Sequence, residues 1–536
     1  MMRIFNLLSV SIVISTVLFS CKKTSDTETI TTLPDPPKNT YTYATSDGFG
    51  SDQQHNLNII YFIPKDLDTV AGYKKRLSEI LLMGQKFYKE EMTRLGYPGK
   101  TFGLWVNDKN RVKIITIFGT KTKGEYPREG GSAAIAAEIN AHFAAKPGDQ
   151  TSLHTLILLP PYGYNADGTP IDGPFYGTGR WCYAMDYEGL ELKHMGTSKF
   201  TKWYGGMMHE LGHGLNLPHN CLKMSEKPNL GTALMGAGNY TLSLSKTSLT
   251  ATDAAILNAN QIFNNDSKTY YAAVTASIHN LNASYDESKS AIVISGKFTT
   301  THKVNSIIYY NDPNVNNEGL GVNKDYNAVT WESKPFGTNE FRIEMPLADL
   351  EFKGNTAYEL RIGLVHENGT VKSFSYLFNF LNDKPILEFG NRTELSKQGW
   401  SITSFSSEET SGEGATDGRA TNLIDGDLNS YWHSKWTGTA ASYPHQIVID
   451  MGGLKSVEGV SIVQRNSLSR SVKDFEILHS IDGQSFVSAG NYILVNSGSI
   501  QYFKFPNKLS IRHLKIVAKS AHDGDKFAAL AEIGAF

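Results

Sequence analysis

The sequence predicts a multidomain protein in which an α/β domain is followed by two β-rich domains. At 536 residues the chain is long enough for three or four domains of ordinary size. Residues 50–268 alternate strand patterns with long amphipathic helix patterns, which is the order of an α/β domain. From residue 269 the pattern changes to short alternating strands with polar turns, and a further unit runs from residue 386 to the end.

The first 21 residues precede the folded part and have the layout of a secretory signal peptide. Arg3 gives a positive start, and residues 4–19 are almost continuously apolar but short for a bilayer-spanning helix. Cys21 directly follows a small residue, which resembles the cleavage box of bacterial lipoproteins. That resemblance implies lipidation of Cys21 and attachment at the outer membrane or cell surface, with an uncleaved anchor or a soluble secreted product as the alternative. Residues 22–49 are rich in Thr, Ser, Asp, Pro and Lys, so we expect a flexible tether.

The charge pattern indicates neither nucleic acid nor an anionic membrane surface as a partner. The net charge is −2, and no long basic or acidic block interrupts the sequence. Contact with a membrane is therefore expected only through the lipid anchor.

The strands and helices of residues 50–268 follow from their apolar spacing. Residues 58–63 read as a strand, and residues 70–95 carry apolar side chains at helical spacing. The segments that follow are two strands, a helix and a buried-type strand, at residues 101–106, 111–118, 132–145 and 153–159. The Gly-, Tyr- and Asp-rich residues 160–179 read as a loop that is long enough to be functional.

Two histidines and a glutamate on one helical face form the strongest chemical signal in the chain. His209 and His213 are four residues apart, so both imidazoles can face one zinc ion at about 2.0–2.1 Å. Glu210 follows the first histidine and can reach a water molecule in the same site. His219 comes too late for the same helix, so the chain must turn back to bring it to the ion.

The residues between His213 and His219 predict such a turn. Gly214 weakens the helix, Asn216 tolerates a left-handed backbone, and Pro218 pushes the residue before it out of the helical region. Three neutral imidazoles would leave one tetrahedral position open, which is typical of a catalytic zinc site.

This stretch resembles the zinc signature of the metzincin metallopeptidases, with Asn216 in place of their usual glycine. That family also carries a methionine turn beneath the zinc, and Ala233-Leu234-Met235-Gly236 follows at a suitable distance. The resemblance implies a zinc endopeptidase with a metzincin-like α/β domain. It also implies the roles of the residues: His209, His213 and His219 as zinc ligands, Glu210 as the general base, and Met235 as the apolar floor of the site.

The chain has three cysteines, and Cys21 is taken by the lipid in this interpretation. The remaining pair, Cys182 and Cys221, would be in an oxidising compartment, and Cys221 comes two residues after His219. A disulfide at the back of the zinc site and two buried thiols are equally good interpretations of this pair.

Residues 269–385 carry only structural signals. Their strand patterns fall at residues 291–296, 304–310, 341–345, 358–365 and 371–380. Short strands with polar turns over this length fit an immunoglobulin-like β-sandwich. No catalytic constellation falls among them, so we expect a spacer domain, with a binding role as the alternative.

Residues 386–536 resemble the discoidin fold, also called the coagulation-factor C-type domain, which bacterial carbohydrate-binding modules share. The resemblance rests on residues 420–436 and 444–452, on the strand at 460–463 and on the closing residues 529–533. It implies a β-sandwich of jelly-roll type. Clustered oxygen ligands also predict a structural calcium site, with a plain Asp-Gly turn as the alternative; these ligands are Asp425, Asp427, Ser430 and Glu532.

Sugar recognition needs an aromatic platform and a few fixed polar groups. His433, Trp436 and Arg465 match the positions of the sugar-contacting residues in galactose-binding relatives of this fold. Trp432 falls where the family buries a tryptophan, so we expect it in the core. Other relatives bind phospholipid or protein, so glycan is the favoured ligand class among three.

Together these signals predict a lipid-anchored extracytoplasmic zinc endopeptidase that cleaves host or dietary glycoproteins such as mucins. Its C-terminal module would hold the enzyme on glycan while the zinc site cuts the same molecule. Two alternatives stand beside this hypothesis. One is an adhesin or glycan-capture lipoprotein that uses the zinc fold as a scaffold, and the other is a zinc hydrolase of a non-peptide amide or ester.

Overall fold

The structure is a computed structural model that describes residues 41–317, 325–387, 394–498 and 500–536. The predicted signal peptide, Cys21 and the first part of the predicted tether lie outside the described residues. The sequence predicts a tether up to residue 49, but the strands β1 (Tyr43–Ala44) and β2 (Phe49–Ser51) already pair antiparallel. In the part of the chain that the structure describes, no helix is both long and apolar enough to cross a bilayer.

A five-stranded sheet forms the centre of the α/β domain, in the strand order β5-β3-β6-β10-β9. The strands are β3 (Asn58–Ile63), β5 (Ile115–Phe118), β6 (Thr155–Leu159), β9 (Tyr176–Thr178) and β10 (Trp181–Met185). They run parallel except for β9, which lies at one edge and is antiparallel to β10. Every residue of β3 and β6 is buried, as expected for parallel strands that are covered on both faces.

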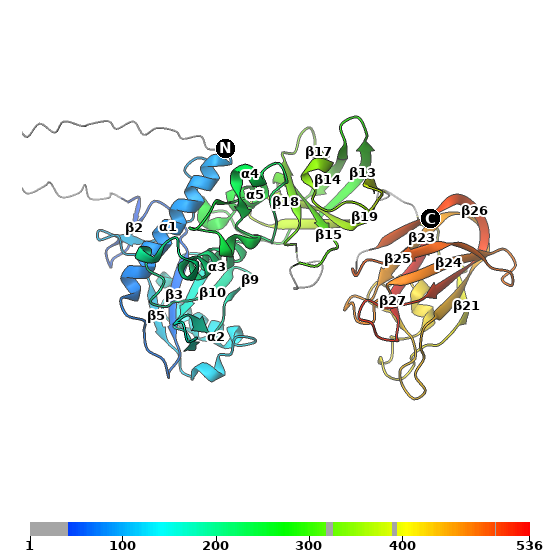
Figure 1. The fold of residues 1–536 in the computed structure, drawn as a ribbon, viewed down its shortest axis with the longest axis horizontal. Helices are drawn as coiled ribbons and strands as arrows, with labels where there is room; N and C mark the ends of the chain where they lie inside the picture. Colours follow the sequence, from blue (N-terminus) through cyan, green and yellow to red (C-terminus); the bar gives the residue numbers. More distant parts are fainter. Residues whose placement is uncertain (1–40, 318–324, 388–393, 499) are drawn as a thin grey trace, which may run out of the picture. The chain divides into compact units, whose positions relative to one another are not determined.

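Helices cover both faces of this sheet (Figure 1). On one face, α1 (Tyr73–Arg94) and α3 (Ser198–Gly214) share a core with the strand residues Ile59 and Leu156. On the other face, α2 (Ser132–Ala145) packs with Ile60 and Ile157. Successive strand residues therefore point to opposite layers, and α3 is held against the sheet next to the edge strand β9.

Short elements complete the domain, and several differ from the predicted ones. The predicted strand at 101–106 is a loop that ends in β4 (Val106–Asn107). The predicted loop at 160–179 contains β9 and the hairpin of β7 (Gly163–Tyr164) and β8 (Pro170–Ile171). After α3 come α4 (Lys227–Leu230), the parallel pair β11 (Thr232–Ala233) and β12 (Thr247–Ser248), and α5 (Ala251–Asn258). These strands have only two or three residues, which is too short for a period to show in sequence.

Two antiparallel sheets form the predicted β-sandwich. One has the order β13-β14-β17 and the other β16-β15-β18-β19-β20. The strands are β13 (Ala276–Asp286), β14 (Ala291–Thr300), β15 (Val304–Pro313), β16 (Val329–Ser333), β17 (Glu340–Pro346), β18 (Ala357–His366), β19 (Val371–Leu381) and β20 (Lys384–Ile386). Side chains from both sheets meet in one core, which includes Ile294, Phe341 and Tyr309.

The sandwich also shares a core with the α/β domain. Along β15, Ile307 and Tyr309 face the sandwich core, whereas Ile308 and Tyr310 belong to the core of the α/β domain. This alternation is the two-residue period of a strand that is covered on both faces. Ala328 and Val365 of the sandwich join the same α/β core. The domain is therefore packed onto its neighbour, whereas the sequence analysis assigned it the role of a spacer.

The C-terminal domain is a sheet-rich unit with its own core. Its seven strands run in the order β22-β27-β23-β26-β24-β25, with β21 paired to β23. They are β21 (Ser401–Phe405), β22 (Trp432–His433), β23 (His445–Gln464), β24 (Asp474–Ser480), β25 (Val487–Ile493), β26 (Gln501–Ala518) and β27 (Ala529–Ala535). Trp432 is 0% exposed at the centre of this core, which confirms its predicted burial.

Candidate active site

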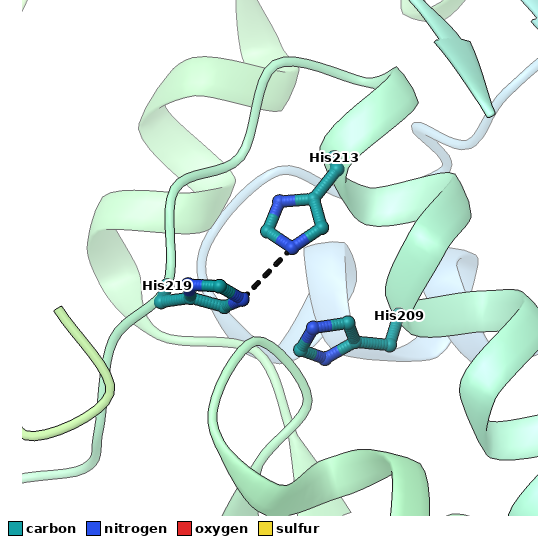
Figure 2. Close-up of side chains that lie close together, drawn as sticks. All are labelled: His209, His213 and His219. Atoms are coloured by element: carbon teal, nitrogen blue, oxygen red, sulfur yellow. Dashed lines mark hydrogen bonds between the residues drawn. The ribbon is translucent and has the colours of Figure 1, made fainter. Parts of the chain in front are cut away.

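The three histidines predicted as ligands lie together at the end of α3. His209 and His213 come from the helix and His219 from the loop after it, and their rings face a common centre (Figure 2). One ring nitrogen of each lies within 4.8 Å of the others, and Nε2 of His213 is 2.9 Å from Nε2 of His219. Within the described residues this is the one group of three or more His, Cys, Asp or Glu side chains that is close enough to hold a metal ion.

The chain turns back between His213 and His219 at the residues that were predicted to form the turn. Helix α3 ends at Gly214, and Asn216 adopts a left-handed backbone with φ 69°. The N–H groups of Leu215 and Leu217 donate to the carbonyls of Leu211 and Gly212, which closes the helix end. Asparagine is one of the few non-glycine residues that adopts this conformation readily, so its presence in place of glycine is accommodated.

Hydrogen bonds fix how two of the ligands present their nitrogens. Nδ1 of His209 lies 2.8 Å from the carbonyl oxygen of Leu234, and Nδ1 of His213 lies 2.9 Å from that of Leu217. A carbonyl can only accept, so both Nδ1 atoms must donate and both Nε2 atoms carry lone pairs. Burial lowers the pKa of His209 to about 4 and also lowers the pKa of His213, so both rings are neutral at pH 7.

This donor set fits a zinc ion. A proton or a cation must lie between the Nε2 atoms of His213 and His219, because two facing lone pairs at 2.9 Å repel each other. Two ligand nitrogens of a tetrahedral zinc with bonds of about 2.0–2.1 Å are roughly 3.3 Å apart, close to the separation found here. Imidazole nitrogens are also among the donors that zinc prefers.

Met235 lies beneath the histidines, where the methionine turn was expected. It is 0% exposed and packs against the backbone of Gly212 in α3. A Cβ atom added to Gly212 would lie 2.3 Å from its sulfur. Because the preceding residue, Leu234, accepts the hydrogen bond of His209, this turn both supports the helix and orients a ligand.

Glu210 is the acid–base candidate of the site. Burial raises the pKa of its carboxyl to about 7, against the opposing effect of a hydrogen bond from the backbone of Gly177. It faces a cavity of about 470 Å³ that is lined from the sheet side and from the segment after Met235. The polar lining residues of this cavity include Arg128, Asn165, Asp172, Lys202, Asn239 and Tyr240. A carboxyl with a pKa near 7 is suited to exchange protons at neutral pH.

Of the two interpretations of Cys182 and Cys221, the disulfide is wrong and free thiols are correct, with Cys182 buried and Cys221 half-buried. Cys182 is buried in the α/β core, with its sulfur 3.7 Å from the carbonyl oxygen of Thr155. Cys221 instead packs against the core of the β-sandwich. Each thiol belongs to a different hydrophobic core, which is why proximity of Cys221 to His219 in sequence does not bring it to Cys182.

The predicted sugar-contacting residues of the C-terminal domain converge on Glu413. Its carboxylate accepts a hydrogen bond from the indole N–H of Trp436 at 2.8 Å, and Arg465 lies 3.5 Å away. Nε2 of His433 is 3.8 Å from the same carboxylate, and Tyr431 donates its hydroxyl to it at 2.6 Å. The structure thus brings the three predicted residues together around an acid that the sequence analysis did not identify.

Three of the predicted calcium ligands come from one turn and Glu532 from β27, and within the described residues their carboxylates are not close enough together to form a metal-holding group. The hydroxyl of Ser430 donates to Asp425 at 2.7 Å, and the backbone N–H of Gly426 donates to Glu532 at 3.1 Å. The ammonium of Lys397 forms an ion pair with the other oxygen of Glu532. Asp427 instead accepts hydrogen bonds from Asn429 within the turn. Calcium binding at this turn stays a prediction.

Solved structures similar to this chain include OgpA from Akkermansia muciniphila. The wild-type protein is 33% identical, and the match covers 66% of this chain and 99% of OgpA with a TM-score of 0.58. Catalytically inactive OgpA in complex with an O-glycopeptide substrate, glycodrosocin, is 32% identical over 66% of this chain and 100% of that chain, with a TM-score of 0.58. This chain belongs to the OgpA family.

In this OgpA-family chain the model of the F5/8 type C domain matches residues 401–533, which confirms the predicted discoidin-type domain. A sialidase from Micromonospora viridifaciens is 37% identical over 144 residues, which is 26% of this chain and 21% of the sialidase. The chain therefore spans about a fifth of that relative's length. Family membership and the F5/8 type C domain together confirm the resemblance drawn from the sequence at the level of a peptidase joined to a discoidin-type domain. The metzincin-like architecture of the α/β domain and its zinc ion stay predictions.

The sequence alone did not predict two residues of these sites, Glu413 and Tyr326. Glu413 lies in a Ser-, Thr- and Gly-rich segment with no local motif, far in sequence from Arg465. Tyr326 belongs to the β-sandwich, yet its ring stacks on His219 with centroids 3.8 Å apart and an interplanar angle of 22°. No spacing within the chain signals either contact, because each depends on how distant segments pack.

Proposed function

We propose that this chain is a zinc-dependent endopeptidase that cleaves peptide bonds in O-glycosylated proteins such as mucins. The observation that carries the proposal is the cluster of three imidazoles at the end of α3. Glu210, the residue after His209 on that helix, also lines a polar cavity. OgpA, whose entire length this chain matches, takes an O-glycopeptide as substrate, and this favours the same class of substrate here.

In this proposal His209, His213 and His219 hold the metal, whose bound form supplies Lewis acidity for the attacking water and the scissile carbonyl. Glu210 accepts a proton from the water and then passes it to the leaving nitrogen. Burial raises the pKa of this carboxyl, so its carboxylate is a stronger base toward the water's proton than an exposed glutamate would be. The backbone N–H of Gly177 steadies the carboxylate form.

The surroundings of Glu210 suit an extended glycopeptide. The edge strand β9 lies beside α3, and an extended substrate can pair with such an edge through its main chain. The polar side chains of the 470 Å³ cavity offer hydrogen bonds to sugar hydroxyls close to the scissile bond. Trp203 and Phe175 line the same cavity and provide apolar surface for a sugar ring.

The C-terminal domain would hold the enzyme on glycan. Trp436 is 41% exposed and can receive the apolar face of a sugar, while Glu413, His433 and Arg465 supply fixed polar groups beside it. Linking such a module to a peptidase raises the local concentration of cleavable chain. We further propose lipid attachment at Cys21, placement at the outer membrane or cell surface, and a structural calcium ion at Asp425, Asp427, Ser430 and Glu532.

The test compares wild type with Glu210→Gln on an O-glycopeptide and on the same peptide without sugar. We expect wild type to cleave the glycosylated peptide, and Glu210→Gln to retain zinc while losing about 10²–10⁴-fold in rate, since the amide cannot accept the proton. Glu90→Gln is the matched control, because Glu90 is exposed on α1, where it forms a surface ion pair with Lys86 at 3.7 Å.

Two results would contradict the proposal. Equal cleavage by Glu210→Gln and wild type would remove Glu210 from the mechanism. A zinc-loaded wild type that cleaves neither peptide but binds glycan would favour the adhesin alternative.

A further inference from the structure

The third predicted ligand of the metal site, His219, contacts an aromatic ring of the β-sandwich. His209 and His213 are fixed by the α3 backbone and by carbonyl acceptors at Nδ1. His219 follows the turn, outside any helix or strand, and the face of its ring lies on Tyr326. Tyr326 belongs to the segment just before β16 of the β-sandwich.

We propose that Tyr326 is a positioning residue for His219, so that the β-sandwich domain completes the metal centre. The proposal rests on the proposed function only in assuming that the three histidines bind zinc. It assigns Tyr326 no contact with substrate or with the metal ion.

Backbone hydrogen bonds hold the two segments that carry the stacked rings next to each other. The N–H of Cys221 donates to the carbonyl oxygen of Ala328 at 2.9 Å, and Cys221 forms a parallel bridge with Val329. His219 and Tyr326 each stand two residues before this hydrogen-bonded pair. The two segments therefore run side by side here, with His219 two residues before the bridge and Tyr326 three residues before it, and their rings stack at 3.8 Å.

The contact continues beyond the bridge. The N–H of Met224 donates to the carbonyl oxygen of Asp349 at 3.2 Å, and Lys227 forms an ion pair with Glu351 at 2.6 Å. The whole segment from His219 to Lys227 is thus held along the sandwich. Without that support, the ligand would sit on a loop that has no element of its own.

Stacking fixes the orientation of the imidazole ring, on which metal binding depends. The lone pair of an imidazole lies in the ring plane, so a flat partner against its face fixes the plane in which Nε2 can point. A centroid distance of 3.8 Å and a tilt of 22° leave little room for the His219 ring to rotate. Outer-shell partners that orient a ligand typically change metal affinity by 10–100-fold when removed.

The experiment measures zinc affinity of the full chain by competition with a chromophoric chelator, without substrate. Tyr326→Ala should bind zinc about tenfold or more weakly than wild type, whereas Tyr326→Phe, which keeps the flat ring, should bind within about twofold. The visible spectrum of the Co²⁺-loaded protein should shift in Tyr326→Ala, because the geometry around the metal changes. Tyr285→Ala is the matched control, a tyrosine of the same sandwich at the far edge strand β13.

Tyr326→Leu keeps the experiment decisive if the alanine variant does not fold, because leucine retains apolar volume but offers no flat face. Zinc affinity of Tyr326→Leu that falls with that of Tyr326→Ala supports the proposal. Wild-type affinity and an unchanged cobalt spectrum in Tyr326→Ala, or equal affinities for Tyr326→Leu and Tyr326→Phe, would overturn it. A wild type that binds zinc tightly but cleaves no peptide would overturn the proposed function alone.

Discussion

Glu413 is the residue around which the C-terminal site is built. Burial alone would raise the pKa of its carboxyl, but hydrogen bonds from Tyr431 and Trp436 lower it below the ordinary value. The guanidinium of Arg465 lies over the Tyr431 ring at 4.0 Å and within 3.5 Å of the carboxylate. Glu413 is therefore an anion that fixes both the aromatic platform and the cation beside it.

Loss of the platform should abolish glycan binding by this domain without unfolding it. Trp436→Ala removes an indole that is 41% exposed, so the core is not affected and the melting temperature should stay within a few degrees. We expect at least a tenfold weaker signal on a galactose-containing glycan array, since a stacked sugar ring loses its apolar partner. Phe405→Ala is the matched control, because Phe405 has the same exposed fraction on the same domain. Equal weakening by both variants would contradict a specific site at Trp436.

The sequence predicted site residues that are close to one another in the chain better than it predicted contacts between distant residues. The placement of His209 and His213 on one helix and the left-handed backbone of Asn216 could be predicted, because helix geometry and turn chemistry act over a few residues. Tyr326 and Glu413 could not be found in this way. Each meets its site across a fold whose packing is not encoded in any local spacing.

Among the secondary-structure elements, the pairing of α3 with β9 controls the shape of the site. Gly177 lies in the middle of β9 against the helix, where a Cβ atom would come within 2.3 Å of Cβ of His213. The same glycine supplies a backbone hydrogen bond to Glu210. The absence of a side chain here lets the edge strand approach both a ligand and the general base.

Gly177→Ala should therefore damage the site through the position of the strand. Either β9 or α3 must move by roughly an ångström to relieve the contact, and a misplacement of that size can cost about 10²-fold in rate. Cleavage of an O-glycopeptide and zinc content are the measurements, and we expect the rate to fall more than the zinc content. Gly124→Ala is the control, because a Cβ atom at Gly124 would meet nothing within 4 Å. Wild-type activity in Gly177→Ala would contradict this prediction, because it would mean that β9 can move away from α3 without disturbing the site.

The sequence predicted the long elements of the fold and missed the short ones. Helices α1 and α2 and strands β3 and β6 have enough residues for an apolar period to be visible. Strand β9 has three residues, one of them a glycine, and was predicted as part of a loop. It forms because β10 offers hydrogen-bonding groups along its edge, which is a tertiary effect.

For the whole molecule, the distribution of hydrophobic cores determines which domains are expected to unfold together. The core of the α/β domain includes Ile308, Tyr310 and Val365 of the β-sandwich, so these two domains have apolar surface in common. The residues of the C-terminal core come from that domain alone. The change of sequence pattern predicted a separate C-terminal domain, which the F5/8 type C match at residues 401–533 confirms. The shared packing between the first two domains could not be predicted in this way.

This arrangement predicts two unfolding transitions in calorimetry. The α/β domain and the β-sandwich should melt together, and removal of metal with a zinc-selective chelator should lower that transition by roughly 5–10 °C because a bound ligand stabilises only the folded state. The C-terminal domain should melt separately and be unaffected by that chelator. Restoring zinc should restore the first transition. A single melting transition that shifts as a whole when the chelator is added would contradict independent unfolding of the C-terminal core.

The contact between Tyr326 and His219 also sets where this polypeptide can be divided. The F5/8 type C domain has a core of its own, so it could be exchanged for another binding domain without disturbing the α/β domain and the β-sandwich. A cut after residue 268 would instead remove an aromatic neighbour of the metal site. If the proposed function holds, the shortest active fragment of this chain should therefore contain both the α/β domain and the β-sandwich, and only the third domain should be dispensable for cleavage.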